Sequence, residues 1–168
     1  MKTVDVVICP VDNHNVHRLQ ELNLQLLAVR YNLAFYKEVL GAPLGYAQLV
    51  CVGDYAVGAI FCRRERMEEG LDGLQRTYIM TFGVMENYRR ARIGHNLCGL
   101  TCSRLLEGVI AQSIQDGVVQ VYLHVQTSNI AALQFYRSHG FEATEILRNY
   151  YKHIDPPDCY VLRRHLTP

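Results

Sequence analysis

The sequence predicts one domain of the mixed α/β (α+β) class, with a central sheet of about seven strands flanked by about four helices. The chain has 168 residues, of which 49% are apolar and 20% charged, as is typical of a globular domain with a sizeable core. Strand-like runs alternate with helix-like runs along the chain. Linkers, repeats and low-complexity segments are absent from the sequence, so a single domain over residues 1–168 is expected.

The first half of the chain has two helical patterns set among strand-like runs. Residues 3–9 alternate in hydrophobicity, and Pro10 is expected to end that strand. Apolar residues then recur at helical spacing as far as Leu27, after a cap at Asp12 or Asn13. A second short helix is expected at 33–40, and the expected strands are residues 3–9, 46–52, 55–63 and 76–84. The Gly53-Asp54 pair indicates a hairpin turn, and the charged residues 64–75 are interpreted as a solvated loop.

The second half begins with a polar turn at 86–92 and a long helix from Ile93 that ends at Gly117. A β-branched, apolar strand follows at 118–125. When a helix connects two strands of one sheet, the two strands normally lie side by side and parallel. The strand at 118–125 is therefore expected beside the strand at 76–84. The remaining expected elements are a helix at 129–138, capped by Thr127 or Ser128, and strands at 141–151 and 158–166.

Charge and cysteine content exclude several function classes. Lys and Arg number 17 and Asp and Glu number 16, and a net charge of +1 argues against a bulk binder of nucleic acid or membrane surfaces. The six cysteines form no CxxC pair and no zinc-like spacing, so we expect no metal site. No run of 18 apolar residues occurs, and the N-terminal apolar run is too short for a signal peptide. We therefore expect a soluble protein in a reducing, intracellular compartment.

Three places in the sequence could carry chemistry. The first is the basic turn from Tyr88 to Gly94, which holds three arginines before a long helix. The free N–H groups of a helix N-terminus suit a phosphate, and the arginines would add charged contacts. The alternative is a solvated basic loop. The segment matches neither a Walker A loop nor a dinucleotide fingerprint.

The second place is the pair Tyr78 and His124, on the two strands expected to be parallel neighbours. His124 interrupts an apolar strand, and a buried polar side chain needs a partner. The alternatives are a hydrogen-bonded core histidine and a group that transfers protons near neutral pH. The third place is Tyr150-Tyr151, where neighbouring strand residues would point to opposite faces, one of them toward a cleft. The alternative is two aromatic residues that only favour a strand.

Together these segments resemble the GNAT superfamily of acetyltransferases, and within it the N-terminal acetyltransferases of the NatE type. The resemblance covers nearly the whole chain, and the YIMT (78–81), LHVQ (123–126) and NYYK (149–152) segments are its most specific motifs. The other matching segments are Leu22-Asn23, Tyr31-Asn32, Phe35-Tyr36-Lys37, Tyr88-Arg89-Arg90, Ser128-Asn129, Phe135-Tyr136-Arg137, Gly140-Phe141 and Ile154.

The resemblance implies a role for each of these positions and a GNAT fold. Tyr78 and His124 match the catalytic pair of the family. The positions that match its acetyl-CoA contacts are Phe82, Gly83, Val84, Arg89, Arg90, Ala91, Arg92, Ile93, Gly94, His95, Asn129, Ala132, Phe135 and Tyr136. The positions that match its peptide pocket are Leu27, Ala28, Val29, Tyr31, Met80, Tyr150, Tyr151 and Ile154. No metal belongs to this set.

The chain departs from the family pattern at two sites. The family turn reads RxxGxG, whereas Arg92 stands here at the first glycine. An arginine at this position can crowd the bound pyrophosphate, or it can bind the pyrophosphate through its positive charge. The family has Phe-Pro where this chain has Leu27-Ala28, which implies a looser pocket for the first residue of the substrate.

The resemblance implies an enzyme that transfers acetyl from acetyl-CoA to the α-amine of protein N-termini, preferably Met followed by an apolar residue. The expected mechanism is direct attack by an amine that Tyr78 and His124 deprotonate through water. A backbone N–H near Phe82 is expected to stabilise the oxyanion, and Tyr136 to lie near the departing sulfur. Alternatives are a lysine acetyltransferase of the same fold and a weakly active CoA-binding adaptor subunit of a ribosome-associated complex. The implied partners are nascent or mature N-termini and the NatA complex, and the implied location is the cytoplasm and also the nucleus. Neither nucleic acid nor membrane is an expected partner.

Overall fold

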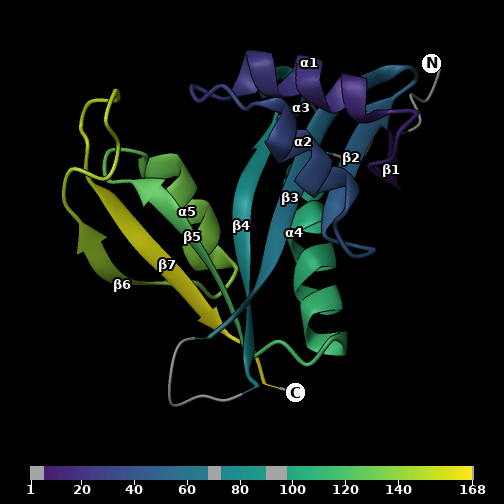
Figure 1. Cartoon of the computed structure of the whole chain (residues 1–168). Helices are drawn as coiled ribbons and strands as arrows, with labels where there is room; N and C mark the ends of the chain where they lie inside the picture. Colours follow the sequence, from purple (N-terminus) through teal and green to yellow (C-terminus); the bar gives the residue numbers. More distant parts are fainter. Residues whose placement is uncertain (1–5, 68–72, 90–97, 168) are drawn as a thin grey trace. The chain divides into compact units, whose positions relative to one another are not determined.

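The computed structural model describes residues 6–67, 73–89 and 98–167. Seven strands form one mixed sheet in the order β1-β2-β3-β4-β5-β7-β6 (Figure 1). The strands are β1 (Val6–Pro10), β2 (Ala47–Val52), β3 (Tyr55–Arg66), β4 (Gln75–Val84), β5 (Gln120–Gln126), β6 (Glu142–Leu147) and β7 (Cys159–His165). The helices in the described ranges are α1 (Val16–Leu26), α2 (Leu33–Leu40), α3 (Glu86–Arg89), α4 (Cys98–Gln115) and α5 (Ile130–Ser138). The predicted fold is confirmed, with the short α3 as an additional helix.

The chain divides into two compact units. Unit 1 comprises Met1–Arg63 and Met80–Gln112, and unit 2 comprises Arg64–Ile79 and Ser113–Pro168. Strands β3 and β4 each contribute residues to both units. The single domain over residues 1–168 stays a prediction. None of the helices in the described ranges is both long and apolar enough to cross a membrane.

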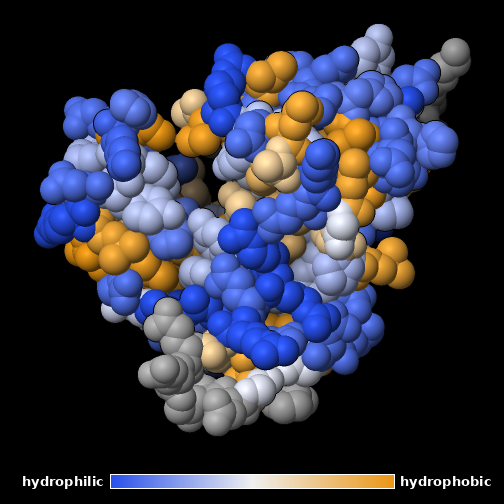
Figure 2. Space-filling view, viewed as in Figure 1, coloured by the Kyte–Doolittle hydropathy of each residue, from blue (hydrophilic) through white to orange (hydrophobic). Residues whose placement is uncertain are grey.

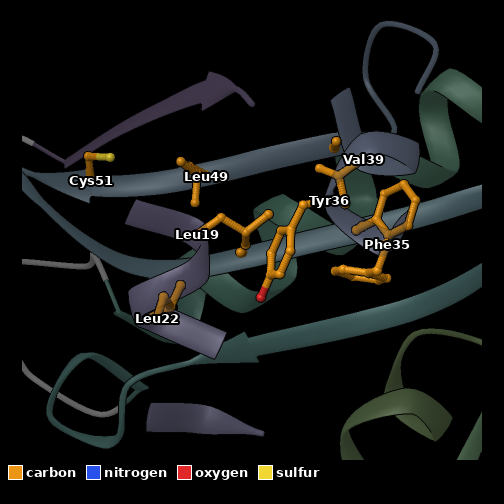
Figure 3. Close-up of a cluster of buried hydrophobic side chains, with 10 residues drawn as sticks. Leu19, Leu22, Phe35, Tyr36, Val39, Leu49 and Cys51 are labelled. Carbon is orange, nitrogen blue, oxygen red and sulfur yellow. The ribbon is translucent and has the colours of Figure 1, made fainter. Parts of the chain in front are cut away.

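The core of unit 1 lies between α1, α2 and the strands β2 and β3. Its buried members are Leu19, Leu22, Phe35, Tyr36, Val39, Ala47, Leu49, Cys51, Ala59 and Phe61. Figure 3 shows side chains of α1 and α2 gathered over β2. Apolar residues at helical spacing on α1 and α2 therefore cover one face of these antiparallel strands. On the outer side Leu24 and Leu33 stay exposed, and Figure 2 shows apolar patches in the region of α1 and α2.

In unit 2, strand β5 lies between β4 and β7. It pairs with β4 in parallel, with Tyr78 opposite Tyr122, and with β7 in antiparallel fashion. The parallel pairing predicted from the strand–helix–strand order is confirmed. Thr77 on β4 and Ser113 on α4 share a buried hydrogen bond of 2.9 Å between their hydroxyl groups.

The structure corrects several element boundaries of the first part of the chain. Residues 64–66 continue β3 and Gln75 begins β4, where a loop was expected. Arg64 pairs with Asp116, and Glu65 pairs with Arg76, so charged residues are compatible with a strand end here. The expected polar turn contains α3. Strand β1 ends at Pro10, as expected, with the proline as its last residue. Helix α1 begins at Val16, after an N-cap at Asn15 and not at the expected Asp12 or Asn13.

Boundaries of the second part also differ. Strand β5 begins at Gln120, two residues later than expected, and α5 is capped by Asn129 instead of Thr127 or Ser128. Strand β6 ends at Leu147, so the expected strand at 141–151 is too long. Asn149 follows with a φ of 53°, in the left-handed region, where a strand cannot continue. Tyr150 and Tyr151 are therefore loop residues.

Candidate active site

Strand geometry places Tyr78 and His124 on one face of unit 2. Tyr78 lies opposite Tyr122 in the parallel pairing of β4 and β5, and His124 follows Tyr122 by two residues. Side chains two apart on a strand share a face. The face of β4 that carries Tyr78 also carries the half-buried Met80 and Phe82, as the alternation in the sequence predicts.

The hydroxyl of Tyr78 lies 3.1 Å from Nδ1 of His124, which is hydrogen-bonding distance. The Tyr150 hydroxyl lies 3.4 Å from the same nitrogen. The Tyr150 ring stacks on the imidazole, with ring centroids 4.5 Å apart and planes at 17°. The structure therefore brings together three residues that lie far apart in the sequence, each of which the sequence predicts to be functional.

His124 is half-buried, and its pKa lies below the ordinary value of 6.5 mainly because burial disfavours the imidazolium. Arg163 also lowers this pKa, whereas Glu145 and Glu65 raise it. The lowered pKa leaves the ring neutral at pH 7. With Nδ1 as the acceptor and the ring proton on Nε2, the Tyr78 hydroxyl donates to His124. A neutral histidine that accepts from a phenol can remove a proton from a group bound to that phenol.

Three further polar residues of unit 2, none of them predicted from the sequence, form a hydrogen-bonded group beside Tyr78. Tyr122 stacks on Tyr78 with ring centroids 4.8 Å apart, and its hydroxyl donates to Glu65 Oε2 over 2.7 Å. Arg76 Nε donates to the same oxygen over 3.1 Å. Tyr122 could have been found from its position two residues before His124. Glu65 gave no such signal, because 57 residues separate it from Tyr122 and it lies in the segment interpreted as a loop.

The loop between β6 and β7 holds Tyr150 over the imidazole. Asp158 accepts a hydrogen bond of 2.9 Å from the backbone N–H of Asn149, and its other oxygen accepts from Arg148 over 2.6 Å. These two hydrogen bonds lower the pKa of the Asp158 carboxyl, and the bond from the Asn149 N–H has the larger effect. The Tyr151 N–H donates to the carbonyl of Pro157 over 2.9 Å. Backbone hydrogen bonds at Asn149 and Tyr151 therefore hold the loop on both sides of Tyr150.

The predicted peptide-contact residues occur in both units. In unit 1, Tyr31 and Met80 pack against the core cluster, and the Tyr31 ring stacks on Phe35 at 4.0 Å. Leu27, Ala28 and Val29 form the segment after α1, where Ala28 and Val29 are exposed. In unit 2, Tyr150 is exposed, whereas Tyr151 and Ile154 are half-buried. The peptide role of all eight residues stays a prediction.

The predicted coenzyme contacts fit a ligand to different degrees. Phe82 and Gly83 are half-exposed at the end of β4, and Ala132 and Phe135 are half-exposed on α5, so all four are accessible to a bound molecule. Asn129 is exposed, although its side chain caps α5 by accepting from Ala132 N–H over 3.1 Å. The start of a helix, with its free backbone N–H groups, suits the phosphates of a coenzyme.

Other predicted coenzyme residues are less accessible. Val84 is buried, and its carbonyl accepts from Nε of Arg89, so that part of the guanidinium is already engaged. Tyr136 is buried against Phe141, with ring centroids 5.5 Å apart. Its expected place near the departing sulfur stays a prediction. Arg90, Ala91, Arg92, Ile93, Gly94 and His95 lie outside the described residues. Among the residues that are described, no group of His, Cys, Asp or Glu could hold a metal ion.

Comparison with known proteins identifies the family. The model of the acetyltransferase (GNAT) family matches residues 12–141. This chain belongs to the GNAT acetyltransferase family. It is 40% identical to N-alpha-acetyltransferase 50 of Danio rerio over 157 residues, which are 93% of this chain and 86% of the relative. It is 36% identical to the probable N-acetyltransferase san of Drosophila melanogaster, over 93% of this chain and 78% of that one.

A solved structure gives the same result. Naa50 of Arabidopsis thaliana, in complex with the bisubstrate analogue CoA-Ac-MVNAL, matches with a TM-score of 0.82 and 38% identity. The match covers 97% of this chain and 100% of that one. The predictions of a GNAT fold and of an N-alpha-acetyltransferase are thereby confirmed.

Proposed function

We propose that this GNAT enzyme transfers the acetyl group of acetyl-CoA to the α-amine of protein N-termini that begin with Met and an apolar residue. The observation that carries the proposal is the hydrogen bond between Tyr78 and Nδ1 of a neutral, half-buried His124. The analogue bound to the Arabidopsis relative supports both substrates, since its title joins CoA to an acetylated peptide of sequence MVNAL.

The Tyr78–His124 pair is a modest base, which suits deprotonation of an α-amine better than deprotonation of a lysine side chain. An α-amine has a pKa of about 8, so a tenth or more of it is neutral at pH 7.4, against about a thousandth of a lysine with a pKa near 10.4. Tyr78 takes the amine proton, directly or through one water, while its own hydroxyl proton passes to Nδ1 of His124. The imidazole becomes imidazolium, and the charge is balanced by the loss of one proton from the ammonium group.

Acetyl-CoA supplies the acetyl group as a thioester, whose carbonyl carbon the neutral amine attacks without an acyl-enzyme. Cys62 and Cys159 are poor nucleophiles for such a step, since burial raises the pKa of both and keeps these thiols protonated. We propose that a backbone N–H near Phe82, at the half-exposed end of β4, stabilises the developing negative charge.

Side chains at the proposed peptide contacts favour an apolar second residue. Val29, Met80 and Ile154 carry no charge to pair with an acidic side chain, and an acidic residue desolvated there would lack a partner. Leu27-Ala28 provides less contact area than an aromatic residue and a proline. We therefore propose that discrimination for Met is weaker than in relatives with that pair. We also propose the NatA complex at the ribosome as a partner and the cytoplasm, together with the nucleus, as the location.

A peptide comparison tests the proposal. Peptides that begin Met-Leu, Met-Asp and Ser-Leu are assayed with an N-terminally blocked lysine peptide at equal concentrations. The highest kcat/KM is expected for Met-Leu. The highest value for the blocked lysine peptide would show a lysine acetyltransferase instead, and the highest for Met-Asp would contradict the apolar preference. Turnover of none of them, with CoA binding retained in calorimetry, would favour an adaptor subunit.

A further inference from the structure

A group of polar side chains lies behind Tyr78 in unit 2, outside the proposed proton path. Glu65 is the second-last residue of β3, Arg76 is the second residue of β4, and Tyr122 lies on β5. Glu65 Oε2 accepts from both the Tyr122 hydroxyl, over 2.7 Å, and Arg76 Nε, over 3.1 Å. The Arg76 guanidinium carbon also lies 4.5 Å from the centroid of the Tyr122 ring. Each of the three side chains is thus fixed by the other two.

Tyr122 connects this group with the proton path. Its ring stacks on Tyr78, with centroids 4.8 Å apart and planes at 20°. His124 meets Tyr78 edge-on, with centroids 5.4 Å apart and planes at 81°. A small rotation of the Tyr78 ring would lengthen the 3.1 Å bond to His124 Nδ1, and such bonds weaken steeply with poor alignment. The stack on Tyr122 restricts that rotation.

We propose that Tyr122 and Glu65 are positioning residues that hold the Tyr78 hydroxyl in line with Nδ1 of His124. The inference rests on the proposed function, because it concerns the geometry of the same proton relay. Burial, followed by the bond to Glu65, raises the pKa of Tyr122, so this phenol stays protonated. Tyr122 therefore serves as a fixed hydrogen-bond donor and not as a second base. Removal of the Glu65 acceptor leaves a buried hydroxyl unpaired and the ring free to shift.

The effect of Tyr122 and Glu65 on the position of Tyr78 can be distinguished from the effect of the Glu65 charge on the pKa of His124. The charged groups that act on His124 are Glu145, Arg163 and Glu65, and Glu145 has a stronger influence than Glu65. The hydroxyl groups around it belong to Tyr78 and Tyr150. Replacement of the Glu145 or Glu65 carboxylate by an amide is expected to lower the pKa of His124, because both carboxylates raise it. Replacement of Tyr122 by Phe keeps every charge but removes the bond to Glu65.

The experiment measures kcat, both KM values and the pH profile of kcat, with Met-Leu peptide and acetyl-CoA. Tyr122→Phe is expected to lower kcat about tenfold, with KM values within twofold of wild type and the acid limb unmoved. Glu65→Ala is expected to lower kcat as much as Tyr122→Phe, and the double variant no further, because both changes remove the same bond between Tyr122 and Glu65. Glu65→Gln, which keeps an acceptor for Tyr122, is expected to restore kcat to within threefold of wild type.

Two controls complete the design. Tyr160→Phe removes a hydroxyl from β7, where the register of Val125 with Tyr160 places it on the face opposite His124. It is expected to leave kcat unchanged. Glu145→Gln changes a charge that acts on His124 without touching Tyr122, and is expected to shift the acid limb while the kcat plateau stays. Thermal melts of all variants confirm that they are folded.

Three outcomes decide the matter. A kcat for Tyr122→Phe within twofold of wild type, while Tyr78→Phe falls about a hundredfold, overturns the positioning role and leaves the proposed function standing. Wild-type turnover in Tyr78→Phe overturns the proposed mechanism and the inference with it. If Tyr122→Phe does not fold, equal kcat values for Glu65→Ala and Glu65→Gln overturn the inference.

Discussion

Two tyrosine hydroxyl groups lie close to one imidazole nitrogen in the candidate active site. Nδ1 of His124 lies 3.1 Å from the Tyr78 hydroxyl and 3.4 Å from that of Tyr150. A neutral imidazole has a single acceptor nitrogen, so the shorter contact with Tyr78 is the stronger bond. Burial keeps the ring neutral, and this neutrality is what allows His124 to accept a proton. Proton transfer from Tyr78 therefore depends on the pKa of His124.

The first prediction concerns that pKa. An NMR titration of the His124 ring proton, assigned by its loss in His124→Ala, should have its midpoint below 6.5 because burial disfavours the charged form. The folded state then binds this proton less readily than the unfolded chain, so its stability falls as pH drops from 6.5 through the folded pKa. Glu145→Gln should lower the midpoint further, since Glu145 raises it. A midpoint above 6.5 in the wild type contradicts the account.

At the scale of elements, the β6–β7 loop shows how sequence and structure diverge. Tyr150 and Tyr151 favour a strand, yet the chain turns at Asn149, whose φ is 53°. Asp158 stabilises the turn by accepting from the Asn149 N–H and from Arg148. This contact joins residues 9 and 10 positions apart, whereas strand propensity depends on neighbouring residues. The loop, and not a strand, therefore brings Tyr150 to His124.

The second prediction tests this loop. Asp158→Ala removes the acceptor for the Asn149 N–H, and we expect the KM for peptide to rise about fivefold as Tyr150 loses its fixed position. Asp158→Asn keeps an acceptor oxygen and should raise KM less. Steady-state kinetics with a Met-Leu peptide checks both variants. Equal KM values for Asp158→Ala and wild type would mean that the loop needs no such bond.

At the scale of the whole molecule, hydrophobic periodicity predicted the order of strands and helices, because alternation and helical spacing are local properties. It also placed Tyr78, Met80 and Phe82 on one face of β4. What it could not predict depends on contacts distant in sequence. Strand β3 extends to Arg66 because Arg64 and Glu65 find ion-pair partners on other segments. The Glu65–Tyr122 bond is part of the candidate site for the same reason.

The third prediction concerns the stability of the folded chain. Leu22 on α1 is buried in the core of unit 1, whereas Leu24, two residues further on, is 56% exposed. Leu22→Ala should lower the free energy of unfolding by about 2–5 kcal/mol because it leaves a cavity. Leu24→Ala, the matched control, should change it by less than about 0.5 kcal/mol. Urea denaturation measures both, and similar losses in the two variants would contradict the assigned core.

The most direct test of the account is the turnover of Tyr78→Phe and His124→Ala on a Met-Leu peptide at saturating acetyl-CoA. Each variant should stay folded and lose about a hundredfold or more in kcat, the range expected for loss of a general base. The peptide KM should change far less, because the relay acts on the reacting amine and not on binding. Near-wild-type turnover in either variant would show that this residue only packs the site, and would contradict the proposed proton relay.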